Sequence, residues 1–304
     1  MSTAPDGAAA YVLNFNNLDD TRECVRSLLA ARPRGPEVRL VDNGSTNDSS
    51  ERVAREFGVG LLRTGSNLGY AGGMNWCLRH AREAGVARCL LVSTDVVFPP
   101  GSVEALVDCA AAGEFAVVAP VHVSEGGGEV RSAGKRLALR RGDAWHDTVV
   151  RGEAPYEVEA TDGAVLLVDV GRVLAAGGFE ERYFMYWEDL DLSARLRSAG
   201  QRVLLCPRSR VVHTVSGTAG RDSVLQTYYS ARNRLLFLRA HAGAGTALMA
   251  MLYQGVCAMP VFLAHLIRTG QRSSARALVL GTLDGLLRPG EAPPGGDPLR
   301  QRRP

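Results

Sequence analysis

The segment EVRLVDNGSTNDSSERVAREFG, residues 37–58, passes from one residue pattern to another within a few positions. Its apolar start predicts a short strand that runs to Val41 and ends in an Asp-Asn-Gly turn. The pattern then becomes helical from Ser49 or Ser50, where a serine is well suited to cap the first turn. The segment therefore predicts a strand, a turn and a helix in succession.

The same order of elements occurs on both sides of this segment. Upstream, AYVLNF (residues 10–15) is a short apolar strand that leads into a helix with Asp19 or Asp20 placed to cap it. Downstream, VGLLRTGSNLGYAGGMNWCLRHAREAG (residues 59–85) predicts a third strand, a glycine-rich loop and a helix from about Met74. Three consecutive units thus share one plan.

A fourth strand and helix occupy residues 88–113, and FAVVAPVHV (residues 115–123) reads as a fifth strand. Residues 124–160, rich in glycine and charge, predict loops or a small hairpin; they contain no recognisable acceptor motif. A strand, a short helix and a Gly-Gly turn follow in 164–181, and a last strand lies in 202–218. Such alternation predicts an α/β fold, a mostly parallel sheet with helices on both faces, whose ligands bind at the carboxyl ends of the strands.

The composition fits one large globular domain with an accessory segment, since 46% of the 304 residues are hydrophobic and 22% are charged. The six cysteines are scattered and form no Cys-x-x-Cys pair, and the N-terminal stretch MSTAPDGAAA has neither a basic nor an apolar region. These features predict a cytoplasmic protein with reduced cysteines and without a structural zinc ion.

The charge is unevenly distributed. Residues 221–304 contain 11 Arg against 4 acidic residues, a balance of +7, so the net charge of +3 leaves 3 − 7 = −4 for the rest of the chain. Residues 242–267 lack Asp, Glu, Lys and Arg, whereas Gln254, Pro260 and His265 disfavour a membrane-spanning helix. The tail predicts a buried or interfacial helical hairpin, and attraction to an anionic membrane surface rather than to nucleic acid.

Two of the predicted loops carry residues suited to a nucleotide. Asp42 ends the second strand, where a carboxylate accepts hydrogen bonds from a ribose or a base edge, although a plain turn explains it equally well. The loop 67–75 is rich in glycine and permits close backbone approach to a ligand, or else it is only the lead-in to a helix. The first strand lacks a Gly-x-Gly-x-x-Gly loop, which counts against a nicotinamide-dependent oxidoreductase.

The fourth strand ends at Asp95 within LLVSTDVVF, between apolar runs. A carboxylate there is costly unless it is paired or bound to a hard cation. His213, after the last strand, is a candidate second ligand, or a structural histidine.

Three carboxylates gather in RYFMYWEDLDLSARLRSAG, residues 182–200, directly after an aromatic run. One interpretation is an ordinary helix start, in which acidic groups favour the N-terminus and Asp191 pairs with Arg195. The other is a general base whose proton affinity is set by a partly apolar pocket.

Seven segments, in this order, are YVLNFNN, VDNGST, NLGYAGGMN, STDV, GGFEERYFMYWEDLDLSARLRSAG, VVHTVSGT and YYSARNRLLF. Together they resemble the inverting glycosyltransferases of family 2, which have the GT-A fold. They are most similar to the rhamnosyltransferase-like branch, which decorates cell-envelope glycans or secondary metabolites. The resemblance covers roughly residues 10–240, and an ordered set of motifs is more specific than any single one.

The resemblance implies roles for particular residues. Asp189 corresponds to the catalytic base, with Glu188 orienting the acceptor or Asp189 itself. A divalent metal ion, Mg²⁺ or Mn²⁺, would be held by Asp95 and His213, and Ser93 departs from the family pattern at the position of the first aspartate. The nucleotide and donor sugar would contact Asn14, Asn16, Asp42, Asn67, Gly69, Gly73, Asn75, Thr94 and Asp95. The acceptor pocket would include Gly163, Tyr186 and Trp187.

The expected reaction is inverting transfer of a sugar from a nucleoside-diphosphate donor, deoxythymidine-diphospho-rhamnose or a uridine-diphospho sugar. The acceptor would be a hydroxyl of a glycan, a lipid or a natural product. The alternative is a catalytically weak sugar-nucleotide-binding or scaffold subunit at the membrane, suggested by the incomplete acidic motif and the basic tail.

The expected organisation is a catalytic domain over 1–240, a helical extension over 241–288 and a disordered tail over 289–304. The helical extension would contact the inner face of the cell membrane peripherally, or pack onto the catalytic domain, or form a homodimer interface.

Overall fold

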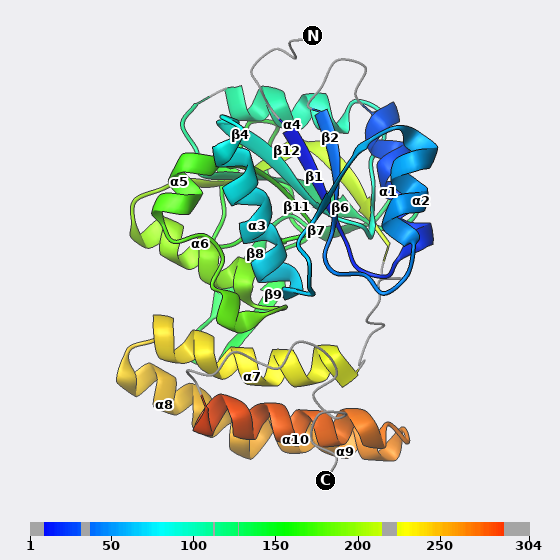
Figure 1. Cartoon of the computed structure of the whole chain (residues 1–304). Coiled ribbons are helices and arrows are strands. Elements are labelled where there is room, and N and C mark those ends of the chain that lie inside the picture. The colour runs from blue at the N-terminus through cyan, green and yellow to red at the C-terminus, as the bar shows by residue number, and fades with distance from the viewer. Residues whose placement is uncertain (1–8, 32–36, 112, 127, 215–223, 289–304) are drawn as a thin grey trace.

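A computed structural model of the chain describes residues 9–31, 37–111, 113–126, 128–214 and 224–288, and places an α/β domain on a layer of helices (Figure 1). Among these residues, ten strands form one sheet in the order β10-β12-β6-β11-β4-β1-β2-β3, with β5 paired to β12 and β7 paired to β6. The strands are β1 (Ala9–Asn14), β2 (Glu37–Asp42), β3 (Gly60–Arg63), β4 (Arg88–Ser93), β5 (Val96–Val97), β6 (Val117–Val123), β7 (Val130–Ser132), β10 (Tyr156–Glu157), β11 (Val165–Asp169) and β12 (Val203–His213).

The sheet is parallel in its N-terminal half and mixed beyond it. Strand β1 pairs in parallel with both β2 and β4, with Asn14 opposite Asp42, and β2 pairs in parallel with β3. Strand β11 runs antiparallel to β4 and to β6, and β6 is parallel to β12. The predicted α/β fold is confirmed, and the reversed β11 leads the chain from the sheet toward the acidic motif.

Helices cover both faces of the sheet, because alternate strand residues point to opposite sides. Tyr11 and Leu13 of β1 join one buried cluster, and Ala10 and Val12 join the other. The first cluster is covered by α3 (Gly69–Glu83), α5 (Val170–Ala175) and α6 (Glu188–Ser198), and the second by α1 (Leu18–Ala30), α2 (Ser49–Phe57) and α4 (Ser102–Ala111).

Helix α2 begins at Ser49, as predicted, whereas α1 does not begin at a capping aspartate. The cap of α1 is Asn17, whose side-chain oxygen accepts a hydrogen bond from the backbone N–H of Asp20 at 3.3 Å. Asp19 and Asp20 occupy the first turn, where negative charge also favours the helix. The predicted cap was therefore wrong by two or three residues.

The glycine-rich segment predicted as a loop forms the first turns of α3, which begins at Gly69 rather than near Met74. A Cβ on Gly69, whose φ is +70°, would lie 2.5 Å from Phe184, and a Cβ on Gly73 would lie 2.6 Å from Leu13. The glycines therefore allow α3 to approach β1 and Phe184 closely, which explains a glycine-rich pattern without a flexible loop.

The region 124–160 contains the small hairpin that its composition predicted. Strands β8 (Lys135–Ala138) and β9 (Asp143–His146) pair antiparallel as a separate two-stranded sheet, with Lys135 opposite His146. The backbone of Lys135 also pairs with Ala160, just before β11. This pairing brings the hairpin to the edge of the main sheet.

Two cysteines are joined, in contrast to the prediction that all six are reduced. Cys109 of α4 and Cys206 of β12 form a disulfide with their Cα atoms 6.0 Å apart, because α4 packs on β12. The 97 residues between them in the sequence conceal that proximity. Four cysteines are free; Cys257 is exposed, and the buried ones are Cys24, Cys77 and Cys89.

The C-terminal helices form the second layer (Figure 1). Helix α7 (Val224–His241) lies nearest the sheet domain and packs along α10 (Arg272–Leu287). A Cβ on Gly281 or Gly285 of α10 would lie within 3 Å of backbone oxygens of α7, so the two helices are in backbone contact. The helical layer thus begins at residue 224, before the boundary at 240 expected from the sequence. The tail expected to be disordered, 289–304, lies outside the described residues.

The apolar segment 242–267 is one helix and not a hairpin, which corrects the prediction. Helix α8 (Ala244–Tyr253), a π-helical turn (Gln254–Ala258) and α9 (Met259–Arg268) are continuous. Pro260 has no N–H and would clash in regular α geometry, and the wider π turn just before it relieves that conflict. The reversal of direction comes after Arg268, so the helix forms a hairpin with α10.

Candidate active site

Side chains at the carboxyl ends of β1 and β2 are linked by hydrogen bonds to the start of α2, and some of them are buried. Asn14 is fully buried, and its amide donates to the hydroxyls of Ser49 and Ser50 at 2.9 and 2.7 Å. The hydroxyl of Ser50 donates in turn to Asp42 at 2.9 Å. Asn14 therefore fixes the start of α2 and the orientation of Asp42, which is also buried, with 8% of its surface exposed.

The neighbouring asparagine side chains form hydrogen bonds with backbone groups. The Asn16 side chain accepts from the backbone N–H of Thr46 at 2.7 Å, and that of Asn67 accepts from Gly69 at 2.9 Å. Asn75 is buried and makes two hydrogen bonds of 2.8 Å with the backbone of Phe179. The buried side chain of Asn75 thus ties α3 to the segment that leads into the acidic motif.

Asp95 and His213, the two expected metal ligands, meet after β4 and β12. The His213 Nε2 lies 3.0 Å from an Asp95 carboxylate oxygen. The hydroxyl of Ser93 donates to the other carboxylate oxygen, so the residue that departs from the family pattern supports Asp95 directly. Burial alone would lower the pKa of His213, but the bond to Asp95 and the charges of Asp162 and Asp95 raise it to about 9. Thr94 lies between Ser93 and Asp95 and is half-buried.

Asp189, at the start of α6, is held by two groups from other elements. One carboxylate oxygen accepts from the Lys135 ammonium at 2.5 Å and from the backbone N–H of Gly163 at 3.1 Å. The other accepts only from the adjacent Leu190 N–H among the hydrogen bonds of the described residues. Lys135, the only lysine of the chain, comes from the β8–β9 hairpin. Sequence reasoning did not assign Lys135 a role, although its uniqueness was a signal.

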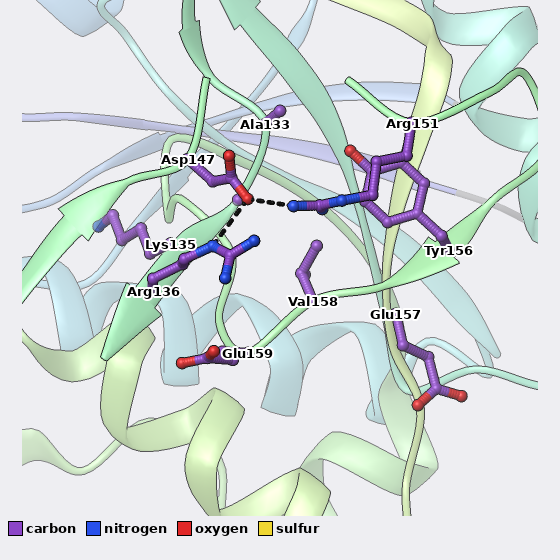
Figure 2. Close-up of a pocket in the computed structure, with 10 residues that line it drawn as sticks. Ala133, Lys135, Arg136, Asp147, Arg151, Tyr156, Glu157, Val158 and Glu159 are labelled. Carbon is purple, nitrogen blue, oxygen red and sulfur yellow. Dashed lines mark hydrogen bonds and ion pairs between the residues drawn. The ribbon is translucent and has the colours of Figure 1, made fainter. Parts of the chain in front are cut away.

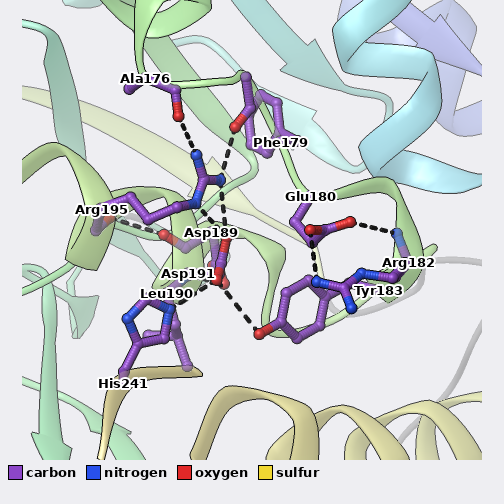
Figure 3. A network of polar contacts seen from close by, with 12 residues as sticks. Ala176, Phe179, Glu180, Arg182, Tyr183, Asp189, Leu190, Asp191, Arg195 and His241 are labelled. Carbon is purple, nitrogen blue, oxygen red and sulfur yellow. Dashed lines mark hydrogen bonds and ion pairs between the residues drawn. The ribbon is translucent and has the colours of Figure 1, made fainter. Parts of the chain in front are cut away.

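Asp191 has the structural role that its spacing to Arg195 suggested. Its carboxylate accepts from Arg195 at 2.8 Å and contacts His241 of α7 at 2.7 Å (Figure 3). The Arg195 guanidinium also donates to the carbonyls of Ala176 and Gly178. The network ties α6 to the turn before it and to the C-terminal helices.

The aromatic run before α6 has an unusual backbone. Phe184, Tyr186 and Trp187 have φ of +64°, +65° and +76°, values that non-glycine residues rarely adopt. The amide of the buried Asn233 on α7 donates to the carbonyls of Tyr183, Met185 and Tyr186, each at 2.8 Å. Asn233 thereby holds the strained loop that delivers Asp189.

The two predicted pocket aromatics differ in their surroundings. Trp187 is buried and packs against Phe237 of α7, with ring centroids 5.3 Å apart. Tyr186 is half-buried. The position of Trp187 supports the loop, and Tyr186 is the more accessible of the two.

A cavity of about 280 Å³ lies between the hairpin and the residues before β11 (Figure 2). Asp147 is one of the residues that line it, and its carboxylate accepts from Arg136 at 3.0 Å and from Arg151 at 2.5 Å. Lys135 also borders it, so this cavity adjoins the Asp189 side chain through one residue. It falls within the region 124–160, in which no acceptor motif was recognised.

Glu188 precedes Asp189, is buried, and has one carboxylate oxygen without a hydrogen-bond partner among the described residues. Burial, and then the charge of Asp189, raise the pKa of Glu188 to about 8. Glu188 is therefore protonated at neutral pH.

This pKa predicts a pH-dependent stability. In the unfolded chain Glu188 ionises near pH 4.5, so the stability that is present below that pH is lost as the pH rises toward about 8. Glu188→Gln mimics the protonated form and removes this loss, so it should gain on the order of 2–4 kcal/mol over wild type between pH 5 and pH 8. Urea unfolding at both pH values measures the gain. Glu104→Gln, on an exposed position of α4, is the control, and parallel pH profiles for wild type and Glu188→Gln would contradict the assignment.

Both a family and individual proteins are similar to this chain. The family model described as "Glycosyl transferase family 2" matches residues 10–155. The N-acetylglucosaminyl-diphospho-decaprenol L-rhamnosyltransferase of Mycobacterium tuberculosis (strain CDC 1551 / Oshkosh) is 32% identical over 277 residues, which cover 82% of this chain and 89% of that protein.

Two solved structures share the fold at low sequence identity. The mannosyltransferase PcManGT from Pyrobaculum calidifontis, solved with GDP-Man and Mn²⁺, aligns with a TM-score of 0.58 at 14% identity, over 92% of this chain and 87% of that one. GalNAc-T7, solved with UDP, GalNAc and Mn²⁺, aligns with a TM-score of 0.58 at 12% identity, over 84% of this chain and 57% of that one. With the mixed sheet and the acidic motif described above, these similarities settle the predicted family: the chain belongs to glycosyltransferase family 2 and is a glycosyltransferase with the GT-A fold, similar to a rhamnosyltransferase.

Proposed function

We propose that this glycosyltransferase transfers L-rhamnose, with inversion, from a nucleoside-diphosphate donor to a sugar hydroxyl of a polyprenyl-diphosphate-linked acceptor. The donor and acceptor classes follow from the activity of the relative that is 32% identical over 82% of this chain. The observation that carries the mechanism is Asp189, which Lys135 and Gly163 hold from one side.

In the proposed reaction Asp189 is the general base. Lys135 and the Gly163 N–H fix one carboxylate oxygen, so the second has a lone pair with which to accept the proton of the acceptor hydroxyl. As that hydroxyl attacks, the bond between the anomeric carbon and the donor diphosphate breaks on the opposite face, and the anomeric centre is inverted. Glu188, neutral at physiological pH, adds no second negative charge beside Asp189.

The leaving diphosphate needs positive charge. The polar groups at the end of β4 fit a divalent cation, because the Asp95 carboxylate and the His213 imidazole lie together and supply oxygen and nitrogen donors. A bound divalent cation would supply Lewis-acid stabilisation of the departing diphosphate. Both solved structures with this fold were determined with Mn²⁺, which supports a divalent metal. On the nucleotide side, Asp42 and the Asn16 and Asn67 loops would bind base and ribose.

We also propose that the C-terminal helices bring the enzyme to the membrane that carries its acceptor. The helix Ala244–Arg268 has a mean hydropathy of 1.7 over its most apolar window, and only 17% of that window is buried. Its exposed apolar side chains include Leu248, Met249, Leu252, Val256 and Val261. Exposed arginines follow at its end and along α10, namely Arg268, Arg272 and Arg276. An apolar face beside basic groups suits an anionic membrane surface.

One experiment tests both proposals. Purified full-length chain is mixed with anionic vesicles that contain polyprenyl-diphospho-N-acetylglucosamine, and with deoxythymidine-diphospho-rhamnose; the product is measured by mass spectrometry, and bound protein by sedimentation. We expect rhamnose transfer and co-sedimentation, with transfer at most a hundredth as fast from a uridine-diphospho or guanosine-diphospho sugar, since rejecting a wrong donor by about 3 kcal/mol gives that ratio.

The controls separate the alternatives. The double variant Leu252→Glu, Val256→Glu should lose sedimentation, whereas Val107→Glu, at an exposed position of α4, should keep it. Nucleotide binding without transfer from any donor would favour the scaffold hypothesis. Loss of a dimer, rather than of vesicle binding, in the double variant would assign the apolar helix to a homodimer interface.

A further inference from the structure

His122 on β6 is buried to 1% exposure, and neither of its ring nitrogens has a hydrogen-bond partner in the part of the chain that the structure describes. Leaving a buried polar group unsatisfied costs about 1–3 kcal/mol, and native interiors rarely do so. The strand around it, VVAPVHV, is otherwise apolar. An imidazole retained in such a place therefore points to a binding partner.

Side chains of the types that bind metal ions lie near His122. Its Nδ1 lies 3.8 Å from one oxygen of Asp162, whose other oxygen lies 3.6 Å from Nδ1 of His146. The His122 and His213 rings are perpendicular, with centroids 5.3 Å apart. One ligand atom from each of His122, Asp162 and His213 lies within 4.8 Å of the others.

These separations are too long for hydrogen bonds and close to those of atoms that share an ion. Three donors that each lie about 2.1 Å from one cation are on average at most about 3.6 Å apart, so the His122–Asp162–His213 set closes around one ion if each ligand atom moves by less than about 1 Å. The rings belong to adjacent parallel strands, β6 and β12, which makes their spacing rigid. Asp162 lies just before β11, the neighbour of β6 on its other side.

The local charge also accommodates a cation. Three carboxylates, those of Asp95, Asp162 and Asp189, lie in this region, and among them Asp189 is paired with the Lys135 ammonium. A donor diphosphate would add further negative charge.

We propose that His122 and Asp162 are further ligands of the divalent cation of this enzyme, in addition to Asp95 and His213, so that two imidazoles and two carboxylates hold it. This rests on the proposed function only in taking the ion to be the one that serves the donor. Two nitrogen ligands favour a transition-metal ion such as Mn²⁺ over Mg²⁺, which prefers oxygen and water. The chain would thus bind Mn²⁺ at least tenfold more tightly than Mg²⁺.

The test is Mn²⁺ binding to the full-length chain, followed by electron paramagnetic resonance. Wild type should bind one Mn²⁺, and pulsed spectra should show ¹⁴N coupling from two histidines. His122→Gln should remove one of the two couplings and weaken Mn²⁺ binding at least tenfold, and Asp162→Asn should weaken it while both couplings stay. His265→Gln, on an exposed turn of α9, is the matched control and should change neither.

Each other outcome overturns the inference: no Mn²⁺ bound by wild type, coupling from a single histidine, or unchanged affinity in His122→Gln. Thermal unfolding without metal checks the fold of each variant. If His122→Gln does not fold, the number of couplings in wild type and the affinity of Asp162→Asn still decide. Failure of the proposed function looks different, because Mn²⁺ would then bind through two histidines while no sugar is transferred to any acceptor.

Discussion

Asp189→Asn should lower kcat for sugar transfer by about 10²- to 10⁴-fold, the usual contribution of a general base, while the affinity for the nucleotide donor stays within about twofold. The amide has nearly the shape of the carboxylate but cannot take the proton of the acceptor hydroxyl. Transfer is measured under saturating donor and acceptor, and donor binding by calorimetry. Turnover close to that of wild type would remove Asp189 from the role of base.

Lys135 complicates this variant, and it also supplies the control. Asp189→Asn leaves a buried ammonium without its counter-charge, which costs about 3–5 kcal/mol when a buried ion pair is broken from one side. The double variant Lys135→Met, Asp189→Asn removes both charges and should regain most of the lost thermal stability without regaining activity. A double variant with restored turnover would show that the loss in Asp189→Asn came from misfolding.

Asn233→Leu should lower both stability and kcat, although Asn233 lies on α7 and, by the proposed mechanism, contacts no substrate. The change removes hydrogen bonds to three carbonyls of the aromatic run, and at about 1 kcal/mol for each bond it should cost roughly 3 kcal/mol of folding free energy. The three residues with positive φ would relax, and Asp189 would lose its position relative to Lys135 and Gly163.

The measurements are thermal unfolding and a separation of kcat from KM. We expect kcat to fall by about tenfold or more, since displacement of a catalytic group by an ångström can cost up to a hundredfold. KM for the donor should stay near wild type, because the residues proposed to bind the nucleotide follow β1 and β2. Glu104→Leu, at an exposed position of α4, is the control. Unchanged kcat in a folded Asn233→Leu would show that the aromatic run keeps its conformation without the clamp.

The elements of the sheet were predictable because each depends on a local pattern. Strand β2, its turn and the start of α2 at Ser49 follow from consecutive residues. The start of α3 at Gly69 was not predictable in this way. Glycine is needed at Gly69 and Gly73 because Phe184 and Leu13, which are distant in the sequence, pack closely against them. The disulfide between Cys109 and Cys206 was missed for the same reason.

In the candidate site, too, the residues expected from motifs must be distinguished from those that distant segments bring together. The meeting of Asp95 and His213 was expected from the family resemblance, and the structure brings them together. Asn14 and Asn75 were expected beside the nucleotide, yet both are buried and hydrogen-bonded within the protein, a distinction that residue type does not reveal. Lys135, His122 and Asp162 stand in no motif; only the pairing of the hairpin and the neighbouring strands brings them to the acidic residues.

The contacts of α7 with the acidic motif have a practical consequence for protein engineering. Asn233 and His241 both bond to the segment that contains Asp189 and Asp191, so a chain truncated at residue 240 would lose the His241 contact and leave α7 without α10. A chimera that takes the C-terminal helices of a relative should therefore be joined before residue 224, so that α7 is exchanged together with the helices that follow it. The residue pairs that cross from α7 to the loop would then have to be exchanged as a matched set.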